Sequence, residues 1–236
     1  GNDDYETNIY VNKSNIIIMF DDGWKSQYTI GYEYMRGKDM KGSIAIIPKN
    51  IGESGYMNKA NLYELYNQNW DLLNHTYDHL VLNDSNINKQ IKSITRGSKW
   101  LEKNGFINHH RVLIYPEGKY NDNTIKALNN MNYTSTRGIE SGFNLNQPGN
   151  LYDIKVKNIL PNTKVNEVKE WINYIIDNNL TLILLFHKLD NNIDKTKMKY
   201  KKKDFYKIID YIDTNKNNLN IITYSEWLET ITYRHK

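Results

Sequence analysis

Two short segments of the sequence carry side chains that could hold and use a metal ion. Asp21 and Asp22 are adjacent and close an apolar run that begins at Ile16, and His75 and His79 stand four residues apart in a later segment. If the second segment is helical, one turn places both imidazoles on the same face. Two His and one Asp can hold a divalent metal and leave positions open for water and substrate. The other Asp is then free to act on that water, so the pattern favours a metal-dependent hydrolase.

Each segment alone also has an ordinary structural explanation. Asp-Gly pairs such as Asp22-Gly23 are common in hairpin turns, and two His can be hydrogen-bonded parts of a core. The segments occur together, however, and each follows a predicted strand, which weakens both alternatives.

Short apolar runs alternate along the chain with longer segments of helical period. The predicted strands are 16–20, 43–47, 70–74, 112–115, 133–136, 181–186 and 219–223. The predicted helices are 25–40, 58–68, 86–103, 122–131 with Asp122 as its cap, 165–177, 204–214 and 225–233, and 141–150 is a predicted loop. This alternation is typical of an α/β fold with a mostly parallel sheet. The length of 236 residues suits a single α/β barrel.

Every candidate catalytic segment follows the carboxyl end of a predicted strand, including His187 after 181–186. Barrel enzymes build their sites on that face. We expect residues 1–14 to be a polar lead-in and residues 15–236 to form one catalytic domain.

Composition narrows the classes of function. An aromatic fraction of 12% argues against disorder. The chain has 31 basic and 27 acidic residues, and its net charge of +4 is too small to favour a nucleic-acid binder. The absence of Cys excludes disulfide and thiolate chemistry. The longest apolar runs, 16–20 and 182–186, are too short to span a membrane. We therefore expect no nucleic-acid partner and no membrane span.

Four motifs in combination resemble those of the polysaccharide deacetylases, the NodB-homology or carbohydrate esterase family 4 enzymes. They read Met19-Phe20-Asp21-Asp22-Gly23, His75-Thr76-Tyr77-Asp78-His79, Tyr115-Pro116-Glu117-Gly118 and Leu185-Phe186-His187. The resemblance spans residues 16–190 in the family's order and implies a distorted (β/α)7-type barrel with parallel strands.

The third motif departs from the family's pattern. The family usually has an Arg two residues before the Pro, where this chain has Ile114, and often a Tyr after it, where this chain has Glu117. An Asp/Trp motif between the third and last motifs is not evident. The Tyr-Pro-x-Gly form resembles the branch that acts on poly-N-acetylglucosamine. The missing Arg leaves open what orients the base.

The resemblance implies a role for each matching residue. Asp22, His75 and His79 would bind one divalent metal, with zinc as the first choice and cobalt, nickel or iron also suited to these ligands. Asp21 would be the general base, and His187 would be the general acid.

Further residues are predicted to contact the substrate. The backbone N–H of Glu117 would donate to the oxyanion, because Pro116 has no N–H. Trp24 would stack on a sugar ring, Tyr115 and Pro116 would adjoin it, and Leu185 would line a pocket for the acetyl methyl. A purely structural role in the core is the alternative for the large apolar side chains.

The resemblance implies a metal-dependent hydrolase that removes N-acetyl groups from an N-acetylglucosamine polysaccharide and releases acetate. An O-acetyl esterase on the same fold is an alternative that also needs His187. A non-catalytic carbohydrate-binding module would have lost a metal or base residue, and none is lost. A nucleic-acid binder using the lysines of residues 195–203 is the least favoured alternative.

We expect an acetylated glycan polymer as the partner and a monomeric protein. The first residues lack the basic and apolar segments of an export signal. An export signal removed ahead of Gly1 would fit an extracellular or cell-surface location, and a virion-associated location is the alternative.

Overall fold

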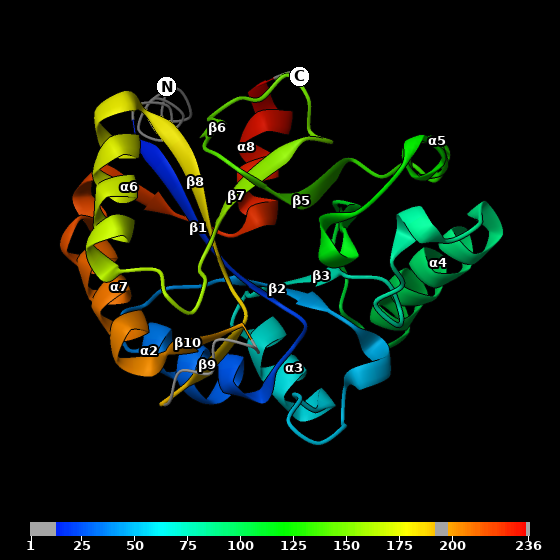
Figure 1. Ribbon diagram of the computed structural model, residues 1–236, viewed down its shortest axis with the longest axis horizontal. Helices are drawn as coiled ribbons and strands as arrows, with labels where there is room; N and C mark the ends of the chain where they lie inside the picture. Colours follow the sequence, from blue (N-terminus) through cyan, green and yellow to red (C-terminus); the bar gives the residue numbers. More distant parts are fainter. Residues whose placement is uncertain (1–12, 192–197, 235–236) are drawn as a thin grey trace, which may run out of the picture.

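A computed structural model of the protein describes residues 13–191 and 198–234 (Figure 1). Residues 1–12 of the predicted lead-in therefore lie outside the described residues, and Ser14 already belongs to the first strand. Lys195 and Lys197 of the lysine-rich segment also lie outside them.

Seven parallel strands close into a barrel, which confirms the predicted fold. Neighbouring strands pair in the order β1, β2, β3, β4, β5, β7 and β8, and β8 pairs back onto β1. The closing register runs from Asn15 opposite Thr181 to Phe20 opposite Phe186. The strands are β1 (Ser14–Asp21), β2 (Ser43–Ile46), β3 (Asp71–Asn74), β4 (Val112–Ile114), β5 (Ser135–Ser141), β7 (Ile154–Asn158) and β8 (Leu180–Phe186).

Helices surround the barrel (Figure 1). They are α2 (Glu33–Arg36), α3 (Lys59–Asn67), α4 (Ile87–Lys103), α5 (Asp122–Asn130), α6 (Val165–Asn178), α7 (Lys202–Thr214) and α8 (Tyr224–Arg234). Short strands add β11 (Leu219–Ile221) beside β1, β6 (Asn144–Leu145) antiparallel to β8, and the pair β9 (Lys188–Asp190) and β10 (Lys199–Lys201). Short turns of 3₁₀-helix are η2 (Pro48–Asn50), η3 (Leu82–Asp84), η4 (Pro116–Gly118) and η5 (Lys216–Asn218).

The helical segment after β1 differs from the predicted helix 25–40. A π-helix, η1 (Gln27–Tyr32), leads into α2, which ends at Arg36. The predicted cap Asp122 is also wrong, because it is the first residue of α5. The Asn121 side chain accepts the backbone N–H of Thr124 and is the actual cap. The negative charge of Asp122 still suits the helix N-terminus.

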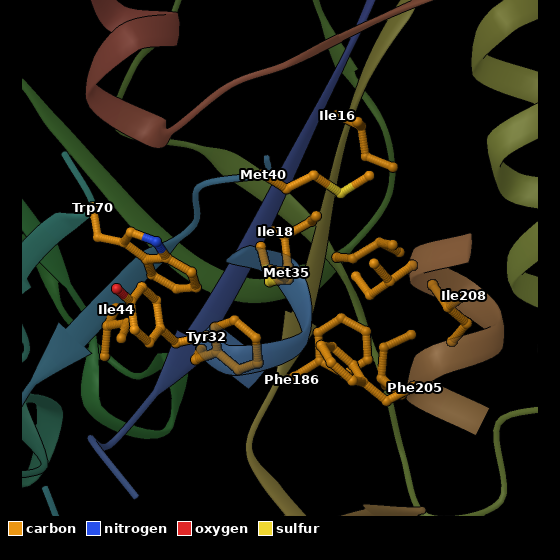
Figure 2. Close-up of a cluster of buried hydrophobic side chains, with 14 of the residues drawn as sticks. Ile16, Ile18, Tyr32, Met35, Met40, Ile44, Trp70, Phe186, Phe205 and Ile208 are labelled. Carbon is orange, nitrogen blue, oxygen red and sulfur yellow. The ribbon is translucent and has the colours of Figure 1, made fainter. Parts of the chain in front are cut away.

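Alternate side chains of each strand pack on the two sides of the barrel wall. Ile17 and Met19 belong to the inner cluster, which α8 closes with Trp227 and Leu228. The outer cluster lies between the wall and the helices, and Figure 2 shows Phe186 of β8 beside Phe205 and Ile208 of α7. Ile17, Met19 and Asp21 are alternate residues of β1, so their side chains point to the same side of the strand. The side chain of Asp21 therefore reaches the inner side at the carboxyl end of β1.

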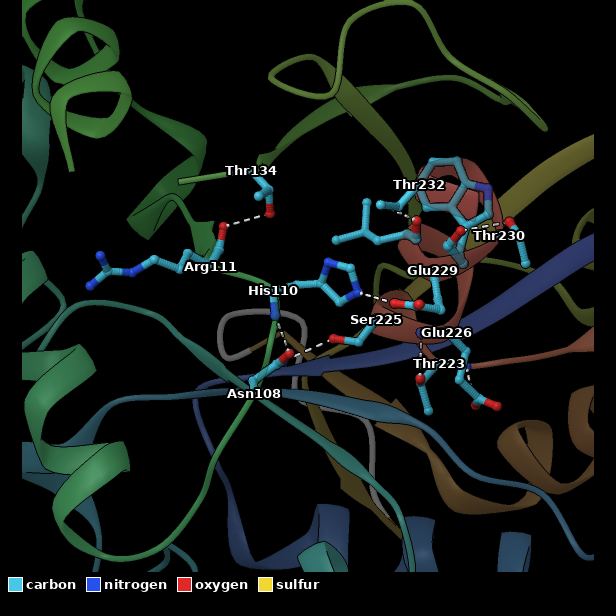
Figure 3. A network of polar contacts seen from close by, with 12 residues as sticks. Asn108, His110, Arg111, Thr134, Thr223, Ser225, Glu226, Glu229, Thr230 and Thr232 are labelled. Atoms are coloured by element: carbon cyan, nitrogen blue, oxygen red, sulfur yellow. Dashed lines mark hydrogen bonds and ion pairs between the residues drawn. The ribbon is translucent and has the colours of Figure 1, made fainter. Parts of the chain in front are cut away.

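A polar network joins α8 to the amino-terminal end of the barrel. Asp71 at the start of β3 accepts hydrogen bonds from the Ser225 N–H (2.9 Å), the Ser225 hydroxyl (2.8 Å) and the Asn108 amide (2.9 Å). His110 Nε2 lies 2.8 Å from the carboxylate of Glu229, and Figure 3 shows the two side chains facing each other. A cavity of about 530 Å³ opens beside these residues. This end lies opposite the strand ends that carry the predicted site.

Candidate metal and catalytic centre

Asp22, His75 and His79 come together at the carboxyl ends of β1 and β3. Asp22 Oδ1 lies 3.3 Å from His75 Nε2 and 3.7 Å from His79 Nε2. One ligand atom from each of the three residues fits within 4.8 Å of the others. The described part of the chain therefore contains the predicted His₂-carboxylate cluster, and this donor set suits a small divalent metal with open positions.

The two His do not lie on a helical turn, so this part of the prediction is wrong. Residues 75–79 form a loop in which Thr76 and His79 both have a φ of 61°, a left-handed conformation that a helix cannot contain. The two imidazole rings nevertheless meet, with their centroids 4.8 Å apart at an angle of 75°. The loop brings them together where one helical turn was expected.

Helix α4 and the side chain of Asn74 hold this loop. Asn74 donates to the carbonyl of Ile94 (2.9 Å), and its Oδ1 accepts the N–H of Thr76 (2.9 Å). Ser93 accepts the N–H of Tyr77 at its carbonyl (3.0 Å). These bonds fix the backbone at Thr76, whose left-handed φ is costly to hold.

The hydrogen bond of His75 selects the ring nitrogen that faces Asp22. Its Nδ1–H donates to the carbonyl of Ile114 at 2.8 Å, which leaves Nε2 with a lone pair in the neutral ring. Without a metal, burial lowers the pKa of His75, but the hydrogen bond to Asp22 and the charges of both carboxylates raise it overall. Burial also raises the pKa of Asp22, and the three nearby His side chains outweigh this and hold it well below its usual range.

Asp21 has a different partner from its neighbour. Its Oδ2 accepts a hydrogen bond from Arg137 Nη2 at 2.5 Å, and the two side chains are buried. Asp22 follows with a φ of 86°, so the chain leaves the strand direction between the two carboxylates. This turn lets adjacent residues face different partners at one site.

Arg137 lies directly beside the position where the family's Arg is missing. In the register of β4 and β5, Arg137 is the partner of Ile114. Sequence spacing gave no sign of it, because it belongs to another strand. The available signal was that Arg137 directly follows the predicted strand 133–136. An Arg that is buried with its strand usually has an acidic partner.

The remaining oxygen of Asp21, Oδ1, is buried and has no hydrogen-bond partner among the described residues. It is therefore the oxygen that is left to accept a proton. His187 is half-buried and directly follows Phe186, whose register partner on β1 is Phe20, so it lies at the end of β8 beside Asp21. The structure thus groups all five residues predicted for metal binding and proton transfer.

The predicted substrate contacts differ in how far they are exposed. Trp24 is half-buried, its ring stacks on Tyr56 with centroids 4.2 Å apart, and the ammonium of Lys188 lies 4.9 Å from the ring centroid. Tyr115 is 1% exposed and Leu185 is fully buried, so neither side chain has surface to offer a ligand unless the site opens.

The third motif forms a tight turn at the end of β4. Pro116 is buried and begins η4, and Glu117 has a φ of 56°. The charge of Glu117 acts on His79, which places the turn near the cluster. The oxyanion role of the Glu117 N–H stays a prediction, as does the sugar contact of Pro116.

The sequence also matches a family model. The model for polysaccharide deacetylases matches residues 9–136, more than half of the chain. The chain belongs to the polysaccharide deacetylase family. This match includes the first three motifs and ends before His187, so the place of His187 in the site rests on the geometry above.

Individual relatives agree with this membership. YxkH of Bacillus subtilis (strain 168), a candidate polysaccharide deacetylase, is 32% identical over 118 residues, 50% of this chain and 42% of YxkH. The poly-beta-1,6-N-acetyl-D-glucosamine N-deacetylase of Staphylococcus epidermidis is 28% identical over 178 residues, 67% of this chain and 59% of that protein. The chain thus spans only about half the length of these relatives.

A solved structure shows the same fold. The family 4 acetyl xylan esterase from Clostridium thermocellum, in complex with a cobalt ion, has a TM-score of 0.64 at 14% identity and covers 92% of this chain and 91% of the esterase chain. At this identity the likeness shows the fold alone.

Proposed function

We propose that this chain is a metal-dependent deacetylase that removes N-acetyl groups from an N-acetylglucosamine polysaccharide and releases acetate. The observation that carries the proposal is the different surroundings of two adjacent carboxylates. Asp22 faces His75 and His79, whereas Asp21 is paired with Arg137. The first arrangement suits a metal ligand and the second suits a base. The name of the Staphylococcus epidermidis relative supports the class of substrate.

Asp22, His75 and His79 would hold the metal, and the fixed Nε2 lone pair of His75 supports this assignment. Zinc is our first choice, with cobalt, nickel or iron as other suitable ions. The cobalt-bound esterase of the same fold supports a divalent ion of this class. When bound, such an ion lowers the pKa of a coordinated water and polarises the amide carbonyl.

The chain's own residues then manage the protons. Asp21 accepts a proton at Oδ1 from the water whose oxygen bonds to the acetyl carbon. Arg137 holds the other oxygen and fixes the orientation of the carboxylate. The N–H of Glu117 donates to the developing oxyanion. His187 gives a proton to the sugar nitrogen as the C–N bond breaks, so acetate and a free amine leave.

The polymer would lie over the carboxyl ends of the strands, next to Trp24 and Pro116. Such a substrate implies action outside the cell or at its surface, and we propose that the monomer is the active unit. No helix within residues 13–191 and 198–234 is both long and apolar enough to be a membrane span.

Acetate release from a panel of acetylated glycans tests the proposal. The panel contains N-acetylglucosamine oligomers, the single sugar and O-acetylated xylan, each with and without a chelator. We expect release from the oligomers, little from the single sugar, loss after chelation and recovery with zinc or cobalt. The Asp21→Asn variant, purified identically, controls for contaminating activity.

Two results would overturn parts of the proposal. Release from O-acetylated xylan alone would replace it with an O-acetyl esterase. If the protein is shown to be metal-free after chelation and keeps its full activity, the proposed metal dependence is contradicted.

A further inference from the structure

The amide of Gln27 bridges the ends of the two strands that carry the proposed base and acid. Its Nε2 donates to the backbone carbonyl of Asp21 at 2.6 Å and to that of His187 at 3.0 Å. An amide nitrogen has two hydrogens, so each carbonyl receives one. Because both neighbours can only accept, they also fix which end of the Gln27 amide faces them.

This bridge stands where the strand pairing stops. The paired register of β1 and β8 ends with Phe20 opposite Phe186. Asp21 and His187 are the next residues on each strand, and the side chain of Gln27 joins their carbonyls. The amide therefore continues the connection between the strands by one residue, at the level where the proposed chemistry takes place.

Gln27 is buried and is anchored through its amide nitrogen, whereas its Oε1 has no hydrogen-bond partner among the described residues. The side chain is fully buried, and it belongs to the first residue of the π-helix η1. Single π-helical turns are frequent at functional sites. The preceding residue adds a second tie, because the Ser26 hydroxyl accepts the N–H of Leu189 at 2.9 Å. Residues 26–27 thus hold both the end of β1 and the chain that follows β8.

We infer that Gln27 is a positioning residue that sets the separation between Asp21 and His187. The inference rests on the proposed function, in which these residues take a proton from water and give one to the sugar nitrogen on either side of the acetyl carbon. Losing the bridge frees two strand ends, and it removes no hydrogen bond to the side chain of Asp22, His75 or His79. The expected consequence is a slower chemical step with little change in substrate or metal binding.

The test compares two buried glutamines in the zinc-loaded protein. Gln27→Met removes both N–H groups at similar volume. Gln90→Met is the matched control, because Gln90 is also buried and its amide is bonded to the Ser85 carbonyl and the Thr124 hydroxyl, not to the strand ends that carry the proposed base and acid. For Gln27→Met we expect kcat to fall on the order of 10–100-fold, with KM and zinc content within about twofold of wild type. We expect the kcat of Gln90→Met to stay unchanged.

Gln27→Glu is a second variant that keeps the shape of the side chain, and its carboxyl group donates at most one hydrogen bond, so it cannot bridge both carbonyls. It should lose kcat in the same way. Equal kcat losses in the Gln27→Met and Gln90→Met variants, or a wild-type kcat in both Gln27 variants, would overturn the inference. Failure of both Gln27 variants to fold, while Gln90→Met folds, would assign Gln27 to fold stability and also overturn it.

A spectroscopic readout separates this inference from the proposed function. The imidazole ¹H–¹⁵N signals of His187, assigned with the His187→Ala variant, should shift in Gln27→Met and not in Gln90→Met. The signals of His110, at the other end of the barrel, should stay in place. This result is measurable even if the wild type releases no acetate, which would count against the proposed function alone. Unchanged His187 signals would overturn the positioning role.

Discussion

Buried carboxylates lie at both ends of the barrel, but their surroundings differ. At the amino-terminal end, Asp71 accepts bonds from Ser225, Asn108 and Ser43, and each of its oxygens has a partner. At the carboxyl end, Asp21 keeps one buried oxygen without a partner among the described residues. A fully bonded buried carboxylate stabilises a fold, whereas an incompletely bonded one marks a place where a ligand or a proton is expected.

The turns at the carboxyl end also have an unusual backbone. Asp22, Thr76, His79 and Glu117 all have positive φ values, and all lie in the turns that form the candidate site. Such conformations are costly for residues other than Gly and persist where the surrounding structure holds them. The network around Asp71 and Ser225 contains no residue with positive φ among its described members. Positive φ also occurs at the amino-terminal end, in the turns that lead from a helix into β2, β3, β5 and β8, at Asp39, Asn69, Asn132 and Asn179. The two ends therefore differ in the partners of their buried carboxylates and not in backbone conformation alone.

The largest combined loss of stability and acetate release is expected for Arg137, because it supports the proposed base. Arg137→Ile should leave Asp21 buried without its partner and lower the free energy of unfolding by about 3–5 kcal/mol. Acetate release should fall on the order of 10²-fold or more. Moving the charge by adding Ile114→Arg should recover part of both losses, because Ile114 and Arg137 are register partners. Chemical denaturation and acetate assays of the single and double variants measure this, and no recovery would argue against the cross-strand replacement.

His187 should affect turnover and leave the metal site intact. His187→Ala should reduce amide turnover by about 10²–10⁴-fold, the usual contribution of a general acid. An activated ester with a good leaving group should lose less, because its leaving group needs no proton. Equal losses on both substrates, at unchanged zinc content, would indicate a structural role.

Gly97 should affect the metal site through the His loop. A Cβ at this position would lie 2.2 Å from Asn74 Oδ1, so Gly97→Ala must displace the side chain that holds residues 75–79. We expect zinc affinity to fall by about 10-fold, as for other residues that support metal ligands. Gly37→Ala is the control, because its Cβ would meet only Tyr34 O at 3.5 Å. Competition with a chromogenic chelator measures both, and equal affinities would contradict the proposed support.

Asp71 should have the smallest effect on activity. In Asp71→Asn an amide N–H₂ would face donors from Ser225 and Asn108, and the free energy of unfolding should fall by about 1–3 kcal/mol. The kcat for acetate release should remain at the wild-type value at a temperature where the variant is folded. A large loss of kcat in folded Asp71→Asn would break the distinction between the two ends.

The sequence indicated a parallel α/β fold and the candidate site residues because their signals are local, and the resemblance of four motifs added the (β/α)7 barrel and the role of each residue. Apolar runs mark the strands. Asp21 and Asp22, His75 and His187 follow directly after three of them, and His79 lies four residues beyond His75. Parallel strands of a barrel then bring these ends to one face. The fold class and the candidate site residues could therefore be predicted before the order of the strands was known.

The parts that were missed depend on contacts between distant segments. Arg137 reaches Asp21 only through the register of β4 and β5, and no spacing along the chain reveals that register. Strand β7 was not predicted, because Lys155 and Lys157 alternate with its apolar residues and shorten the hydrophobic signal. The loop form of residues 75–79 depends on Asn74 and α4, and tertiary contacts of this kind override a local helical pattern.

The most direct test of the account compares the two adjacent carboxylates by metal content and acetate release. Asp21→Asn should keep one zinc per chain and lose most of its acetate release, because an amide cannot take the proton from water. Asp22→Asn should lose zinc, because a neutral amide is a poorer ligand than a carboxylate. Circular dichroism of both variants confirms that they are folded. Loss of zinc in Asp21→Asn with retention in Asp22→Asn would reverse the assigned roles, and full activity in both would contradict the central claim.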